Sequence, residues 1–229
     1  MSAAPIIRAR GLHHSFGAVD ALRGIDVDLY AGEALAIMGP SGSGKSTMLH
    51  VLAGVISPDR GQVFFDDRLI SDLPESMRSG VRLRNFGFVF QFGQLLPDLT
   101  GVDNVSIPLL LAGTPRRAAL TTAHEKLERL GVDHLAAKYP GEMSGGEAQR
   151  IAVARALVSR PRVLFADEPT GALDSLSAEQ VMNELTALAE EEGTTLVIVT
   201  HDPRTAAYAQ REVIVRDGRV TAGAMETAP

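Results

Sequence analysis

The chain has 229 residues, of which 45% are hydrophobic and 22% charged, proportions that indicate a globular protein rather than a disordered or membrane chain. The length allows one compact domain that carries a subdomain. The absence of cysteine excludes disulfides and thiolate metal sites and is compatible with a reducing compartment. Nucleic acids require a concentrated basic surface, so the net charge of −6 predicts no nucleic-acid partner.

Apolar stretches along the chain are all shorter than the roughly 18 consecutive residues that cross a bilayer. The opening residues MSAAPIIRAR also lack the apolar core of a signal peptide. We therefore expect any membrane association to occur through a partner. Arg78, Arg82 and Arg84 form a short basic cluster, which we expect on a solvent-exposed helix face.

The first half of the chain predicts short strands around a glycine-rich turn and one helix, the order that a phosphate-binding unit requires. The predicted strands cover residues 6–12, 25–29, 34–38, 61–70 (as a pair) and 86–90, and the helix covers residues 45–53.

The second half predicts a helical region followed by alternating helices and strands, and the chain ends in a hairpin that turns at Asp217-Gly218. Alternation of this kind favours a mostly parallel sheet covered on both faces, an α/β fold. The predicted helices cover residues 102–138, 146–158 and 178–191, the buried strands residues 163–166 and 196–199, and the hairpin residues 213–220.

Residues 39–46, GPSGSGKS, match the phosphate-loop pattern G-x-x-x-x-G-K-[ST] at every defined position. Its glycines let backbone N–H groups converge on phosphates, Lys45 reaches the β- and γ-phosphates, and the Ser46 hydroxyl is a ligand for Mg²⁺. This motif predicts binding of a nucleoside triphosphate. The predicted contacts are Gly39, Pro40, Ser41, Gly42, Ser43, Gly44, Lys45, Ser46 and Thr47.

Residues 163–168, VLFADE, form an apolar strand that ends in two acids. Asp167 is the candidate Mg²⁺ ligand, and Glu168 the candidate that polarises a water molecule against the γ-phosphate. An isolated Asp-Glu pair is more often a solvated helix cap. Together with the phosphate loop, it predicts a catalytic site.

Residues 143–150, MSGGEAQR, resemble the signature of the ABC ATPases, usually written LSGGQ and followed by Q-Q-R. Met143 replaces the usual Leu and keeps it apolar, Ala148 replaces a Gln, and Glu147 is the variant found in lipoprotein-release and macrolide-export types. In that family, Ser144, Gly145, Gly146 and residue 147 complete the ATP site of the opposite protomer.

The resemblance spans about residues 6–220 and implies further site residues. Phe16 corresponds to the aromatic residue that stacks on adenine, although a core phenylalanine is an open alternative. Gln91 corresponds to the glutamine that contacts Mg²⁺ and the attacking water, Asp174 of GALD to an interface residue, and His201 to the switch histidine at the γ-phosphate.

The resemblance also implies the ABC ATPase fold: a P-loop core with a mostly parallel sheet, an antiparallel β subdomain and a helical insertion. We expect a single domain over residues 1–229, with a core at about 1–90 and 140–229 and a helical subdomain at about 91–139. The expected cofactors are ATP and Mg²⁺.

The expected function is that of a transport ATPase that dimerises around ATP and drives a separate membrane permease from the cytoplasmic face. The sequence around LLPDLT and ADEPTGALD looks most like that of ATPases that serve exporters or lipoprotein-extraction systems. Leu95, Leu96 and Leu99 are candidates to seat a permease helix, with packing inside the insertion as the alternative. A regulatory ATPase that signals through a membrane partner to a cell-wall hydrolase is the alternative function.

Overall fold

The computed structural model describes residues 4–221, and these form two compact units, one of residues 4–82 with 195–221 and one of residues 83–194. This grouping does not test the expected division at residues 91 and 139, which stays a prediction. No helix in the described range is both long and apolar enough to cross a membrane.

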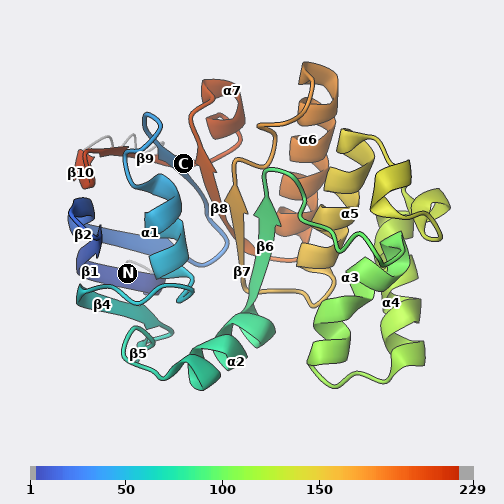
Figure 1. Ribbon diagram of the computed structural model, residues 1–229, viewed down its shortest axis with the longest axis horizontal. Coiled ribbons are helices and arrows are strands. Elements are labelled where there is room, and N and C mark those ends of the chain that lie inside the picture. The colour runs from blue at the N-terminus through green and yellow to red at the C-terminus, as the bar shows by residue number, and fades with distance from the viewer. Residues whose placement is uncertain (1–3, 222–229) are drawn as a thin grey trace. The chain divides into compact units, whose positions relative to one another are not determined.

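The first unit contains an antiparallel sheet in the order β2-β1-β4-β5, in which β1 (Pro5–Phe16) pairs with β2 (Val19–Tyr30) and with β4 (Arg60–Phe65), and β4 pairs with β5 (Arg68–Leu69) (Figure 1). Both long strands extend beyond their predicted ranges, β1 past residue 12 and β2 to positions before residue 25. Gly11 and Gly24 have positive φ and lie at register shifts, so bulges absorb them and pairing continues.

The same unit contains the carboxyl-terminal strands. Strand β3 (Ala34–Met38) pairs in parallel with β8 (Thr195–Thr200) and β9 (Arg211–Arg216), and β10 (Arg219–Thr221) closes an antiparallel hairpin with β9. Helix α1 (Lys45–Leu52) contacts β8 and β2, and α7 (Pro203–Ala206) contacts β8 and β3. The predicted turn is confirmed, because Asp217 and Gly218 have φ of 49° and 72°.

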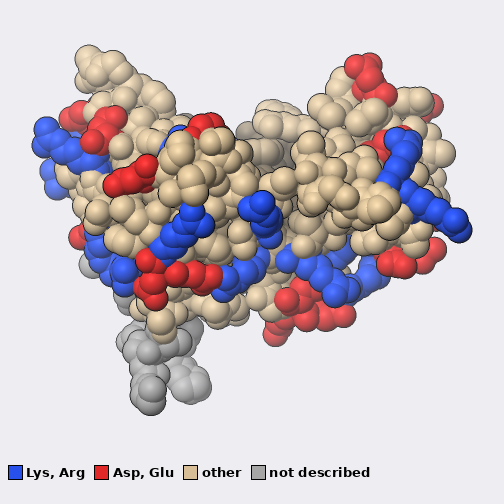
Figure 2. Space-filling model, turned by 90° about the horizontal axis from the view of Figure 1, so that it is seen from below, with Lys and Arg blue, Asp and Glu red and all other residues tan. Residues whose placement is uncertain are grey.

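The basic cluster lies on α2 (Glu75–Asn85), which buries no residue, as expected for a solvent-exposed helix. Arg78 and Arg82 both form ion pairs with Glu75. Figure 2 shows that basic and acidic side chains lie next to one another on the face seen there. Glu75 thus compensates part of the positive charge that the three arginines give α2.

The second unit pairs β6 (Phe86–Phe90) in parallel with β7 (Val163–Asp167), and α5 (Gly145–Leu157) contacts β6 (Figure 1). Helix α5 also contacts α3 (Gly101–Leu111), α4 (Arg116–Arg129) and α6 (Ser175–Glu191). Two short 3₁₀ turns, η1 (Asp133–Leu135) and η2 (Pro140–Glu142), connect α4 to α5. The predicted helical region is thus two helices and a turn, with a break at Ala112–Pro115 between α3 and α4.

A buried ion pair ties α4 to the chain just after α6. Lys126 is 5% exposed and its ammonium donates to Glu192, which also accepts from Arg129 at 3.1 Å. Burial of an unpaired ammonium costs free energy, so removal of one partner destabilises the fold mainly because it leaves the other charge buried without a partner.

This geometry predicts the effect of removing one partner. Glu192→Met leaves the Lys126 ammonium buried without its partner, and we expect the free energy of unfolding to fall by about 3 kcal/mol. The double variant Lys126→Met/Glu192→Met replaces the pair by apolar groups and should recover much of that loss. Urea denaturation of both variants measures the difference, and equal stabilities would contradict this account.

Candidate nucleotide site

The phosphate loop joins the end of β3 to the start of α1, as its sequence predicts. Gly39 and Gly44 have φ of 150° and 102°, a backbone region open chiefly to glycine. A Cβ at Gly39 would lie 2.1 Å from the Val215 carbonyl oxygen, and one at Gly44 would lie 2.3 Å from the Ala21 oxygen. Both positions therefore require glycine for conformation and for space.

Two polar side chains of the loop, those of Lys45 and Ser43, bear on whether the loop fits an anion. The Lys45 ammonium is nearly buried and donates to the carbonyl oxygens of Gly39 and Pro40, at 2.9 Å each, so it lies folded along the loop. Within the described residues, the buried Ser43 hydroxyl has no hydrogen-bond partner. Such an orphaned buried group, at the start of a helix with no side-chain cap, fits a phosphate oxygen.

The β9–β10 hairpin is hydrogen-bonded to the phosphate loop. The N–H of Gly218 donates to the Ser43 carbonyl oxygen at 3.0 Å, and its carbonyl oxygen accepts from the Arg23 N–H at 2.8 Å. The β9–β10 turn thus links the phosphate loop to β2. Sequence analysis predicted the turn but not this contact, because nothing local to residues 217–218 indicates a partner far away in the chain.

His201 and Phe16 belong to the same unit as the loop. His201 directly follows β8, and because Met38 pairs with Thr200 it lies beside Gly39. His201 also lines a cavity of about 290 Å³ together with Gly39 and Pro40. Phe16 ends β1 with 54% of its surface exposed and stands edge-on to His14, so the interpretation as a core residue is wrong. Its exposed ring is free to stack on a base.

The second unit places Gln91, Asp167 and Glu168 at one strand edge. Phe90 pairs with Asp167 in the parallel register, so Gln91 and Glu168, the next residues, leave the sheet side by side. Glu168 has φ of 47°, a left-handed conformation that costs a non-glycine residue free energy and that clusters at functional sites. A Cβ on Gly171 would lie 2.8 Å from the Gln91 amide nitrogen, so Gly171 makes room for that side chain.

The signature begins α5 as predicted. Ser144 is the N-cap: its hydroxyl accepts from the Glu147 N–H at 3.3 Å, and the Glu147 carboxylate accepts from the Ser144 N–H at 2.7 Å, a capping box. These hydrogen bonds hold the pKa of Glu147 below its usual value, the bond from the Ser144 backbone contributing most. Gly145 is exposed, and Gly146 packs on Ser177, where a Cβ would lie 3.1 Å from its hydroxyl.

Asp174 has a structural role in this chain. Its carboxylate caps α6 by accepting from the N–H groups of Leu176 and Ser177 at 3.1 and 3.0 Å and from the Ser177 hydroxyl at 2.7 Å. These bonds, with that from the Ser177 backbone first, lower the pKa of Asp174. Its predicted place in a dimer interface stays a prediction.

The loop after β6 presents apolar side chains to solvent. Phe92 and Leu96 are 73% and 49% exposed, whereas Leu95 and Leu99 are half-buried. The buried Asn104 holds this loop, since its amide donates to the Leu96 and Leu99 carbonyl oxygens at 3.1 and 3.0 Å. Phe92 was missed in the sequence analysis because a phenylalanine after a strand is most often a core residue.

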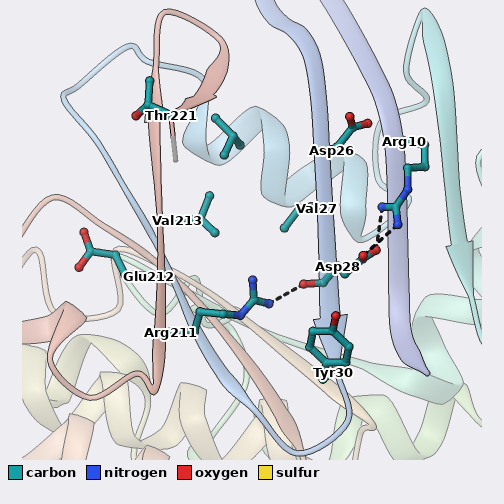
Figure 3. Close-up of a pocket in the computed structure, with 10 residues that line it drawn as sticks. Arg10, Asp26, Val27, Asp28, Tyr30, Arg211, Glu212, Val213 and Thr221 are labelled. Carbon is teal, nitrogen blue, oxygen red and sulfur yellow. Dashed lines mark hydrogen bonds and ion pairs between the residues drawn. The ribbon is translucent and has the colours of Figure 1, made fainter. Parts of the chain in front are cut away.

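A larger cavity of about 410 Å³ lies between β2 and the β9–β10 hairpin (Figure 3). Its arginines are already paired: Arg10 donates to both Asp28 carboxylate oxygens at 2.7 and 2.9 Å, and Arg211 donates to both Glu33 oxygens at 2.6 and 3.0 Å. Because these charges are compensated internally, this cavity does not match a nucleotide phosphate as the loop at Lys45 does.

Two features define a P-loop nucleoside triphosphatase. One is a glycine loop with a lysine between a buried strand and a helix, and the other is a second buried strand that ends in acids. The chain belongs to the ABC transporter family, whose model matches residues 22–171.

Several known proteins are similar in sequence to almost the whole of this chain. The lipoprotein-releasing system ATP-binding protein LolD 2 of Caulobacter vibrioides is 44% identical over 94% of this chain and 96% of its own length. LolD of Syntrophotalea carbinolica is 47% identical over 89% of both chains. The macrolide export ATP-binding/permease protein MacB 1/2 of Paracoccus denitrificans is 44% identical over 99% of this chain and 34% of its own.

Among solved structures, a dimeric post-hydrolysis state of the ATP-binding cassette MJ0796, bound to ADP and Pi, has a TM-score of 0.89 and 35% identity over 97% of this chain and all of that one. The fold prediction is therefore confirmed, and the chain is an ATP-binding and ATP-hydrolysing subunit of the ABC transporter type.

The lowered pKa of Glu147 gives the α5 cap a defined pH dependence. Since the folded-state pKa lies below the unfolded value of about 4.3, the ionised carboxylate stabilises the fold at neutral pH, and this contribution is lost as pH falls through the folded-state pKa. Glu147→Gln keeps an acceptor at every pH. We expect the stability of the wild type relative to this variant to fall as pH drops below about 5, through the unfolded and then the folded-state pKa.

Urea denaturation of both proteins across that range measures the change. A stability difference that does not vary with pH would show that the Glu147 carboxylate does not act as the cap.

Proposed function

We propose that two copies of this chain close on two ATP molecules, each bound between the phosphate loop of one copy and the signature of the other. The observation that carries this proposal is that one chain has two glycine-rich helix starts, at Lys45 and at Ser144, in separate compact units, and helix starts of this kind commonly bind anions. Similarity to the dimeric MJ0796 structures supports the same arrangement.

The proposed chemistry assigns each site residue a role in the transfer of the γ-phosphate. Lys45 and His201 stabilise its negative charge, and Glu168 positions and polarises the attacking water with Gln91 beside it. Phe16 stacks on adenine. Loss of the γ-phosphate removes the group that both copies hold, so the dimer loosens after hydrolysis.

We further propose that Mg²⁺ is bound with the nucleotide by Ser46, Gln91 and Asp167. Within the described residues, no group of three or more acidic or histidine side chains could hold a metal ion alone. A hydroxyl, an amide and one carboxylate fit an ion that takes its remaining ligands from phosphates and water. Bound there, the ion would neutralise charge on the β- and γ-phosphates.

The partner in this proposal is a separate membrane permease of the lipoprotein-release or export type, which would hold the chain at the cytoplasmic face of the membrane. The relatives named LolD cover nearly the whole chain, and this favours such a permease over a signalling partner. The exposed Phe92 and Leu96, on a loop that Asn104 holds in place, are the proposed seat for a permease helix.

The role of Glu168 predicts a trapped dimer. Glu168→Gln removes the group that polarises water but keeps nucleotide binding, so we expect turnover to fall roughly 100-fold or more and the protein to form a stable dimer with ATP and Mg²⁺. Phosphate release and light scattering measure the two effects. Glu179→Gln, on the exposed part of α6, is the matched control. Normal hydrolysis, or a monomer with ATP, would overturn the assignment.

The permease proposal predicts coupled activity. Reconstituted with the permease, the ATPase rate should rise when that permease receives its cargo, and Phe92→Ser should abolish this rise while it leaves the rate of the isolated chain unchanged, because Phe92 lies 73% exposed. Steady-state ATPase assays in proteoliposomes measure both rates. A rate that responds to the permease but to no cargo would favour the signalling alternative.

A further inference from the structure

We propose that Gln149 is a positioning residue for ATP hydrolysis, which holds the two backbone segments that carry Gln91 and Glu168 against helix α5. The inference rests on the roles proposed above for Gln91 and Glu168. It adds a residue that touches neither the nucleotide nor the water and acts through two carbonyl groups.

The Gln149 side chain is 1% exposed and bridges two separate segments. Its amide nitrogen donates to the Phe90 carbonyl oxygen at 2.9 Å and to the Pro169 carbonyl oxygen at 2.7 Å. A glutamine amide carries two N–H donors, so both are used. Gly93 leaves room for this side chain, because a Cβ at that position would lie 3.3 Å from the Gln149 amide oxygen.

The two bonded carbonyls lie next to the proposed catalytic residues. Phe90 immediately precedes Gln91, and Pro169 immediately follows Glu168. Phe90 is the last residue of β6 that pairs with β7, and Pro169 lies two residues beyond Asp167, the last paired residue of β7, so the two bonds act at and just past the end of the ladder. The bridge therefore sets the position of Gln91 relative to Glu168 beyond the end of the β6–β7 pairing.

Arg155 on the same helix shows what is particular to Gln149. The Arg155 guanidinium donates to the Gly93 and Gln94 carbonyl oxygens at 2.6 and 2.8 Å, and both of these residues lie in the loop after β6. Gln149 reaches the segment after β7 as well. Since α5 begins at Ser144, the helix that starts with the signature also fixes both catalytic segments.

The test compares variants of the full chain that differ in amide donors. Gln149→Met keeps length and volume but donates no hydrogen bond, and we expect kcat to fall by at least about 10-fold with KM for ATP little changed. Gln180→Met, which removes an exposed amide from α6, is the matched control. Stoichiometry of ATP binding corrects for any unfolded fraction.

Gln149→Glu provides a readout that a merely structural role would not move. A carboxyl group facing two carbonyl oxygens donates one bond when protonated and repels both when ionised. Its kcat relative to that of the wild type at the same pH should therefore rise as pH falls from about 8.5 to about 6, whereas the ratio for Gln149→Met should stay flat.

Three results would overturn the proposal: a corrected kcat for Gln149→Met within twofold of the wild type, a flat pH ratio for Gln149→Glu, or failure of both variants to fold. Glu168→Gln, measured in parallel, separates this inference from the proposed function. If Glu168→Gln still hydrolyses ATP, the proposed function fails. If it does not, and Gln149→Met turns over normally, the positioning role alone fails.

Discussion

Parallel pairing of buried strands is the constraint on which both halves of the site depend. In the first unit, Met38 pairs with Thr200, so the phosphate loop and His201 leave the sheet at adjacent points. In the second unit, Phe90 pairs with Asp167, so Gln91 and Glu168 do the same. Because the carboxyl ends of parallel strands lie at one edge of a sheet, each of these pairings brings together two segments that are far apart in the sequence.

The segments just beyond these strands are shaped by backbone that only certain residues tolerate. Gly39 and Gly44 let the loop pass within touching distance of the Val215 and Ala21 carbonyl oxygens, and Gly171 leaves space for the Gln91 side chain. The hairpin at Gly218 and the bridge from Gln149 then hold these segments by hydrogen bonds to main-chain carbonyls. Precision in each half of the site thus comes from buried scaffolding rather than from the functional side chains themselves.

Sequence reasoning predicted the strands at residues 34–38 and 86–90 and the helix at the signature almost to the residue, because buried strands and capping boxes are local patterns. It ended the first strand at residue 12 and began the second at residue 25, whereas β1 continues to Phe16 and β2 begins at Val19, because the pairing between distant residues that carries both strands past their bulges is not visible locally. The exposure of Phe16 and the partners of Gln149 depend on tertiary packing, so the sequence left the first open and was silent on the second.

The left-handed backbone of Glu168 has a consequence for the whole protein. Glycine adopts this backbone conformation at a free-energy cost about 1 kcal/mol lower than other residues, yet the position carries an acid. With the role proposed for Glu168 in hydrolysis, stability and turnover make opposite demands on this residue, so a screen for thermostable variants would select Glu168→Gly, which removes the proposed catalytic carboxylate. On that proposal, the fold keeps an unfavourable backbone conformation at the one position where its activity requires an acid.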